Sequence, residues 1–241
     1  MAQAIYDMSA GVVGNAPAGW STPFASDIAL VIRESGGDRY LELTTEGGSG
    51  RRVLSWDAGL NSRVMEVYCE VEVISTAADT DKMLAYRIDS SLSGANSTTC
   101  YVTGDERTSK DSARFARYVN GSFSQLATTT STVAPPVTNI KLRSSVDTDN
   151  LHKLKMWESS DSEPATFVFS MTDTGLDQAG YGGLYCQSGD AEIKILFFSV
   201  GTDGDAAPSA PAETSVTMTI SEATTAADTE SAQANLISTI S

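Results

Sequence analysis

The sequence is poor in the residues from which most catalytic centres are built. Its 241 residues include one histidine and three cysteines. A single histidine excludes HExxH zinc sites and multi-histidine metal centres, which need more than one imidazole. The cysteines, Cys69, Cys100 and Cys186, are odd in number and lie far apart in apolar-alternating runs. This spacing favours reduced thiols in the core over a disulfide framework or a zinc site.

Positive charge and long apolar segments are also scarce. Against 16 Lys and Arg stand 31 Asp and Glu, a net charge of −15 that repels phosphate backbones and anionic headgroups. We therefore expect no nucleic-acid partner. No apolar run approaches the roughly 20 residues of a membrane helix, so no membrane insertion is expected. The first residues also lack the basic and apolar regions of a signal peptide, which argues against export through a cleaved leader.

Alternation of apolar and polar residues is what the sequence contains instead. In the clearest run, Met65 to Val73, every second residue is apolar, while Glu66, Tyr68, Glu70 and Glu72 occupy the other face. Similar short runs recur from residue 5 to residue 200, and no convincing helical period interrupts them. Clusters of Gly, Asn, Asp, Ser and Pro separate the runs. The pattern predicts one all-β sandwich domain over residues 1–205.

The individual strands can be placed from the same alternation. Besides Met65 to Val73, strands are predicted at Ile28 to Glu34, Tyr40 to Thr44, Arg52 to Trp56, Met83 to Ile88, Thr98 to Thr103, Ala113 to Val119, Ser122 to Ala127, Asn139 to Val146, Leu151 to Glu158, Thr166 to Met171, Gly183 to Cys186 and Glu192 to Val200. The Asn120-Gly121 pair predicts a type I′ hairpin between two of them. Trp56 and Trp157 are predicted between the two sheets. His152 alternates with Leu154 and Met156, which indicates a hydrogen-bonded strand residue.

The composition changes at residue 206. The segment 206–241 is rich in Ser, Thr and Ala, is acidic, and contains no Lys, Arg, Gly or aromatic residue. Such a segment cannot build its own core, so we expect a short non-globular extension. It is either a flexible acidic tail or a docking segment for a partner or a sister chain. The apolar residues that would provide attachment or homo-oligomerisation are Val216, Met218, Ile220, Leu236, Ile237 and Ile240.

Several segments, in this order, resemble a known family. They are Arg52-Val-Leu-Ser-Trp-Asp57, the Glu66 to Val73 strand, Tyr86-Arg-Ile-Asp89, Arg117-Tyr-Val-Asn-Gly121, Leu154-Lys-Met-Trp157 with Glu163-Pro164, Thr172-Asp-Thr174, Ala179-Gly-Tyr-Gly-Gly-Leu184 and Phe197-Phe-Ser-Val-Gly-Thr-Asp-Gly204. Together, over residues 20–205, they resemble the concanavalin A-like, laminin-G-like jelly rolls of bacteriophage structural proteins. The resemblance implies two antiparallel curved sheets in a jelly-roll sandwich and a role on a virion surface.

The resemblance also bears on partners and location. It implies a tail-fibre or tail-tip adhesion module, or alternatively a capsid decoration or head-fibre protein, assembled in the host cytoplasm together with other virion proteins. The segment from Ile220 to Asp228 resembles the Ser-Glu-Ala units of long phage tail proteins, which favours the tail. Head and tail both stay open.

A glycan-cleaving enzyme is the alternative from another functional class. Some members of this superfamily use a Glu-x-Asp-x-x-Glu strand, and the nearest run is Glu70-Val-Glu72-Val-Ile-Ser75. Ser75 replaces the carboxylic acid that would protonate the leaving group, whereas retaining hydrolysis requires two carboxyl groups. Glu70 and Glu72 then fit the solvated face of a strand, and we expect no enzyme activity.

Calcium is the metal that the fold family leaves open. Asp147, Asp149 and Glu158 imitate positions of a calcium loop, but His152 stands where that loop needs glycine, so a hairpin turn is favoured. Loop carboxylates elsewhere could hold calcium, yet no spacing singles out a ligand set among Asp89, Asp105, Asp173, Asp177 and Asp190. No cofactor is therefore assigned.

Carbohydrate binding is the predicted activity of the domain, with a host surface glycan as its ligand. Sugars stack on exposed aromatic faces that are bordered by amides and carboxylates. The candidates are aromatic residues in or near loops: Trp20, Tyr101, Tyr118, Tyr181 and Tyr185. Each also has an alternative place in the core, because aromatic side chains are commonly buried.

Overall fold

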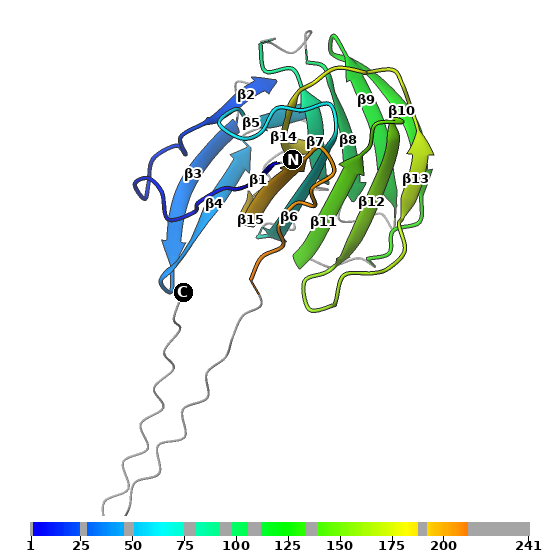
Figure 1. Cartoon of the computed structure of the whole chain (residues 1–241). Helices are drawn as coiled ribbons and strands as arrows, with labels where there is room; N and C mark the ends of the chain where they lie inside the picture. The colour runs from blue at the N-terminus through cyan, green and yellow to red at the C-terminus, as the bar shows by residue number, and fades with distance from the viewer. Residues whose placement is uncertain are drawn as a thin grey trace, which may run out of the picture. The chain divides into compact units, whose positions relative to one another are not determined.

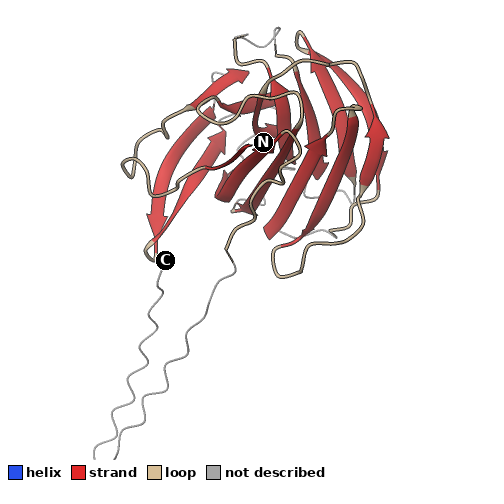
Figure 2. Cartoon of the chain, in the orientation of Figure 1, coloured by secondary structure: helices blue, strands red, loops and turns tan. Residues whose placement is uncertain are grey.

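A computed structural model describes residues 2–24, 28–45, 51–74, 81–91, 98–105, 112–133, 139–187 and 192–211. Across these residues the regular structure consists of strands joined by loops (Figure 2). The strands are β1 (Ala2–Ile5), β2 (Trp20–Phe24), β3 (Ile28–Ser35), β4 (Asp38–Thr45), β5 (Arg51–Trp56), β6 (Met65–Val73), β7 (Lys82–Ile88), β8 (Cys100–Asp105), β9 (Ala113–Val119), β10 (Ser122–Thr129), β11 (Asn139–Val146), β12 (Leu151–Glu158), β13 (Phe169–Thr172), β14 (Tyr181–Gln187) and β15 (Glu192–Thr202).

The strands form two antiparallel sheets that pack face to face (Figure 1). Sheet A has the order β13-β12-β11-β6-β15-β4-β3, and β1 pairs with the second half of β15. Sheet B has the order β10-β9-β8-β7-β14-β5-β2. Each sheet combines pairs of consecutive strands with pairs that are distant in sequence, such as β6 with β15 in sheet A and β7 with β14 in sheet B, as expected for a jelly roll. The predicted all-β, two-sheet antiparallel sandwich is therefore confirmed.

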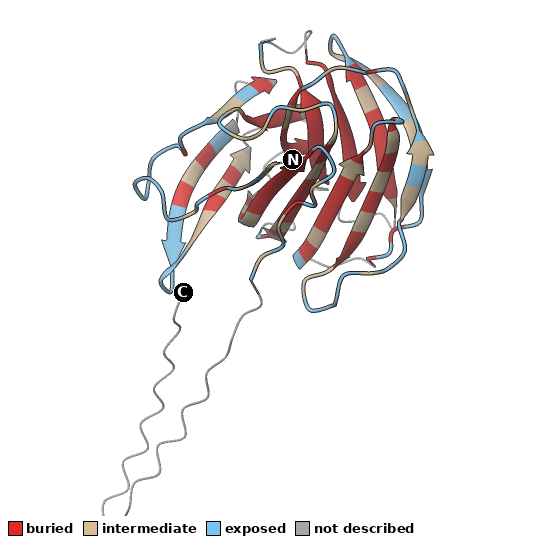
Figure 3. Ribbon diagram, viewed as in Figure 1, coloured by how far each residue is buried: buried red, intermediate tan, exposed pale blue. Residues whose placement is uncertain are grey.

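The main core fills the space between the sheets, and its side chains follow the predicted alternation. On β6, Val67, Cys69 and Val71 point inward and are almost completely buried. They meet inward residues of sheet B such as Leu84 and Leu184. Buried positions follow the middle strands of both sheets, whereas β10 and β13 at the sheet edges are more exposed (Figure 3).

Two hairpins have the predicted turn chemistry. Asn120 and Gly121 have φ values of 48° and 74° between β9 and β10, as a type I′ turn requires. Between β11 and β12, the Asp147 carboxylate accepts backbone hydrogen bonds from Asp149 at 2.9 Å and Leu151 at 3.0 Å. This Asx-type turn gives the Asp147 carboxylate a structural role, and the predicted hairpin turn between β11 and β12 is confirmed.

One aromatic cluster lies outside the main core, contrary to expectation. Tyr68 and Trp157 were predicted on the solvated face and between the sheets, respectively. Both instead lie on the outer face of sheet A, where their rings are 6.0 Å apart and almost completely buried. Phe197 and Ala207 complete this cluster. The prediction for Trp157 is wrong because Met156, its neighbour, takes the inward position.

The cover of this outer cluster is the segment 206–209, which we call the C-terminal strap. It passes in front of sheet A (Figure 1, orange) and is held by hydrogen bonds from Gln3 to the Ala206 carbonyl and from Ser199 to the Pro208 carbonyl. The first compact unit, residues Met1–Ser209, includes the strap. The predicted attachment residues, Val216, Met218, Ile220, Leu236, Ile237 and Ile240, lie outside the described residues. No helix among the described residues is long and apolar enough to span a membrane.

Candidate ligand groove on the outer face of sheet A

The predicted sugar-binding aromatics do not gather at one surface. Tyr101, Tyr118 and Tyr185 are at most 2% exposed, so the expectation that they present exposed ring faces is wrong. Tyr118 and Tyr185 do meet, with their hydroxyls 3.0 Å apart, on the outer side of sheet B. They belong to a second apolar cluster on this side.

The two remaining candidates are only partly buried. Trp20 packs edge-to-face on Phe198, with ring centroids 5.0 Å apart, and stacks on Trp56. These ring contacts give it a packing role at the end of the main core. Tyr181 begins β14 beside Ile88 of β7. No described contact brings Trp20 and Tyr181 together into one binding surface.

The single histidine belongs to a polar network between the sheets. His152 Nδ1 lies 3.0 Å from the Tyr86 hydroxyl, and Nε2 lies 3.1 Å from the Asp173 carbonyl oxygen. The carboxylate of Asp173 accepts hydrogen bonds from the Tyr101 hydroxyl at 2.6 Å and from Arg117 at 2.7 Å. His152 is thus the hydrogen-bonded strand residue that the alternation predicts.

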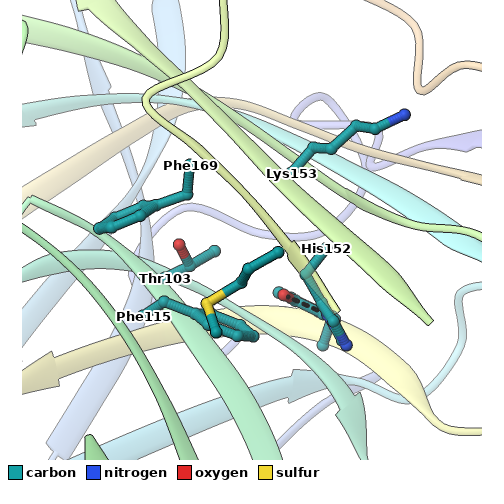
Figure 4. Close-up of a pocket in the computed structure, with 7 residues that line it drawn as sticks. Thr103, Phe115, His152, Lys153 and Phe169 are labelled. Atoms are coloured by element: carbon teal, nitrogen blue, oxygen red, sulfur yellow. Dashed lines mark hydrogen bonds between the residues drawn. The ribbon is translucent and has the colours of Figure 1, made fainter. Parts of the chain in front are cut away.

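Burial and hydrogen bonding shift the pKa values of the ionisable groups in this network. It lowers the pKa of the His152 imidazole to about 4 and raises the pKa of the Tyr101 hydroxyl to about 12. For Asp173, burial acts in the opposite direction, but the hydrogen bonds from Tyr101 and Gly175 and the Arg117 charge lower the pKa of its carboxyl. The adjoining hollow, lined by Thr103, Phe115 and Phe169 among others, has no room for a water molecule (Figure 4). The side chains of this region therefore serve packing.

An open groove lies on the other side of β12, on the outer face of sheet A. Its volume is about 450 Å³, within the range of ligand pockets, roughly 300–1,000 Å³. Three adjacent strands supply the floor. Glu66 of β6 pairs in register with Ser145 of β11, which pairs with Lys153 of β12. Arg143 and Lys155 form the next row of the same floor. We call this site the outer groove.

Two segments form the walls of the outer groove. On one side, the connection between β12 and β13 contributes Glu163 and Phe167. The Phe167 ring is 45% exposed, which is unusual for a large aromatic side chain. The C-terminal strap forms the other side through Ala206, Ala207 and Ser209. The groove therefore depends on segments that are far apart in sequence.

Arg143 connects the floor to both walls. Its guanidinium donates to the Ala207 carbonyl at 2.7 Å and to Ser209, and it forms ion pairs with Glu66 and Glu163. Glu66 in turn accepts a hydrogen bond from the Ala207 amide at 3.0 Å. The Arg143 side chain is only 10% exposed. Arg143 therefore positions the groove and holds the strap.

The ammonium groups of the two groove lysines lie over the exposed ring. The ammonium groups of Lys153 and Lys155 are 5.5 and 5.2 Å from the centre of the Phe167 ring. Lys155 also donates to the Glu163 carboxylate at 2.8 Å. The result is an aromatic face bordered by charged hydrogen-bonding groups, the arrangement expected of a sugar site but made of residues other than the predicted tyrosines. Phe167 was predicted to lie in a strand from Thr166 to Met171. The observed strand, β13, begins at Phe169, so Phe167 lies in the connection before it.

The carboxylates of the predicted catalytic run lie on the same outer face but outside the groove. Glu70 pairs with Lys141 at 3.3 Å, and Glu72 pairs with Lys194 at 3.0 Å. Both are on the outward side of β6, as the alternation predicts, and both are only partly exposed. Ser75 lies outside the described residues. In the described part of the chain, no group of three or more His, Cys, Asp or Glu side chains could hold a metal ion.

Solved structures of low sequence identity have similar folds. The exoplasmic/lumenal domain of VIP36 in its Ca²⁺/Man3GlcNAc-bound form is 11% identical, with 83% of this chain and 90% of that chain covered and a TM-score of 0.52. Its metal-free form is 12% identical over 81% and 89% of the two chains, with a TM-score of 0.53. A Bacillus subtilis protein of unknown function with a galectin-like fold is 13% identical over 76% and 89%, with a TM-score of 0.54.

No family model and no curated protein matches the chain in sequence. At 11–13% identity, the structural likeness establishes the fold alone. Together with the strand order, it identifies the described sandwich as a galectin-like, concanavalin A-like jelly roll.

Proposed function

We propose that the chain is a non-enzymatic, lectin-like module that binds a glycan in the outer groove. The observation that carries this proposal is the exposed Phe167 ring beside Lys153 and Lys155, above a floor of hydrogen-bonding side chains. A sugar ring places its C–H face on an aromatic ring and its hydroxyls on surrounding polar groups. Such concave sites with a few oriented polar groups are typical of small-ligand binding.

Binding is a better account of the groove than hydrolysis. Its two carboxylates, Glu66 and Glu163, are both held by Arg143, and Glu163 also binds Lys155. Hydrolysis with retention or inversion needs one carboxyl group as a proton donor and a second as nucleophile or base. The groove instead offers anchored side chains, which suit a fixed binding surface.

The proposed biological setting is the surface of a bacteriophage virion, as a tail-fibre or tail-tip adhesion module. The order of the sequence segments that resemble phage jelly rolls supports this setting, with a capsid decoration or head-fibre protein as the alternative. Other virion proteins and further copies of this chain would be its partners, through the extension 206–241. Several copies on one particle would also turn weak single-site affinity into avidity. Immunogold labelling of purified particles tests this, and absence of the chain from particles refutes it.

Glycan binding itself is tested with a glycan array probed by the full-length chain. We expect binding to at least one glycan class, and Phe167→Ala should abolish it because the sugar ring can no longer pack its C–H face on the aromatic ring. The matched control is Leu196→Ala, which removes another exposed apolar side chain, 39% exposed, from β15 of sheet A. Both variants should keep the thermal midpoint of the wild type. The proposal fails if no glycan binds or if Phe167→Ala binds as well as Leu196→Ala.

A further inference from the structure

We infer that the outer groove selects an acidic sugar, one whose ring carries a carboxylate. This inference rests on the proposed glycan-binding function and specifies its ligand class. Its basis is the balance of charge among the residues that line the groove. Three cations, Arg143, Lys153 and Lys155, face two carboxylates, Glu66 and Glu163. The groove therefore has a net positive charge in a chain whose net charge is −15.

The excess charge can be assigned to one side chain. Arg143 is compensated by Glu66 and Glu163, and Lys155 by Glu163. Lys153 forms no ion pair with any residue that the structure describes; its ammonium lies over the Phe167 ring. Figure 4 shows the Lys153 side chain directed away from the interior network of Phe115 and His152. This ammonium is the group available to a ligand.

The place of Lys153 suits recognition of a sugar acid. The Lys153 ammonium is 5.5 Å from the centre of the Phe167 ring. A saccharide ring stacked on Phe167 would therefore have its substituents close to this ammonium. Ser145, opposite Lys153 in register, adds a hydroxyl to the same row of the floor. A carboxylate at Lys153 would form a charge-assisted hydrogen bond, which is roughly twice as strong as a neutral one.

The charges around the groove also limit the ligand to a single negative charge at this point. Glu66 and Glu163 are paired with Arg143 and Lys155, so Lys153 leaves one uncompensated positive charge, and a second or third negative charge on the ligand would have no partner. The negative charge of the rest of the chain acts at longer range, where salt screens it beyond roughly 8 Å under physiological conditions. A monocarboxylated sugar therefore fits better than a polysulfated or phosphorylated one.

Isothermal titration of the full-length chain with paired ligands tests the inference. The probes are oligosaccharides that end in galacturonate, glucuronate or N-acetylneuraminate, each compared with its methyl ester. The ester keeps the sugar and removes the charge. For at least one pair we expect the acid to bind about tenfold more tightly, as one charge-assisted contact implies. Lys153→Gln should reduce the affinity for the acid to that for the ester and leave the ester unchanged.

Lys194→Gln is the matched control. Lys194 is also on the outer face of sheet A and also lies over an aromatic ring, 5.3 Å from the centre of Tyr40, but it is outside the groove. Its substitution should leave both affinities unchanged. The inference is overturned if acid and ester bind equally in every pair, or if Lys153→Gln keeps the preference.

The outcomes separate this inference from the proposed function. Equal binding of acid and ester overturns the acidic ligand and leaves glycan binding intact. If neither binds and the glycan array is also negative, both fail. A synthetic peptide of residues 212–241, which is acidic, serves as a competitor. If the peptide binds the groove and no acidic sugar does, the groove is a peptide site and the inference is overturned.

Discussion

The neutral, buried imidazole of His152 makes the stability of the fold depend on pH. The ring is 2% exposed between Tyr86 and Asp173, and burial lowers its pKa from 6.5 to about 4. In the unfolded chain the same ring has its ordinary pKa. The unfolded state therefore takes up a proton at a pH where the folded state does not. The stabilisation is complete above pH 6.5 and is lost as the pH falls toward 4.

The size of the effect follows from the difference between the two pKa values. Linkage over a shift from 6.5 to about 4 gives about 3 kcal/mol across the whole interval. Between pH 7.5 and pH 5 it gives about 2 kcal/mol, because the folded state is still largely unprotonated at pH 5. This is a large fraction of the roughly 5–15 kcal/mol by which a domain is stable.

Urea unfolding of wild type and His152→Gln at both pH values measures this contribution. The glutamine cannot titrate and keeps one amide for hydrogen bonding, so its unfolding free energy should lack the loss of about 2 kcal/mol. The variant will be less stable at pH 7.5 because one buried partner is lost, roughly 1–3 kcal/mol. Its pH dependence, not its stability, is the informative quantity. Equal pH dependence in the two proteins would refute the assignment of a neutral buried imidazole.

Three further predictions concern packing. Gly183→Ala should lower the unfolding free energy in urea by about 3 kcal/mol or prevent folding, because a Cβ there would overlap the backbone carbonyl of Leu54; a change under 1 kcal/mol would contradict the close approach. Trp157→Ala should cost about 3–5 kcal/mol in the same assay through the loss of the outer cluster, and near-neutrality would show that the strap does not bury it. Burial leaves the three cysteine thiols inaccessible and raises the pKa of Cys69 and Cys100, so a thiol reagent should react only after denaturant is added; rapid labelling of the native chain would contradict this.

The strands of the middle of both sheets could be predicted because their alternation is strong. On β6, five apolar residues alternate with polar ones, and the structure follows this pattern except at Tyr68. β1 and β2 were not predicted, since β1 has 4 residues and β2 contains proline, so neither has a clear period. β1 pairs with β15, and β2 pairs with β5. The local sequence of β1 and β2 carries no information about these distant partners.

The outer cluster shows where alternation misleads. A period of two tells which residues share a face but not whether a later segment covers that face. Tyr68 has the position of a solvated residue, and it is buried because the strap crosses sheet A more than 130 residues later in the chain, where Ala207 binds Glu66. The same reason explains why the aromatic candidates were misplaced: their exposure depends on what packs against each face.

Arg143 in the outer groove shows both the use of alternation and its limit, because segments distant in sequence determine its contacts. Arg143 alternates with Lys141 on β11 and, from sequence, is one more cation on a polar face. Its compensation depends on Glu66 from β6, Glu163 from a connecting segment and the strap carbonyl of Ala207, none of which is local to it. Because Arg143 is fully engaged in holding these segments, it can orient the groove without attracting an anion strongly. The selectivity that we infer for acidic sugars therefore depends on Lys153, whereas the shape of the site depends on Arg143.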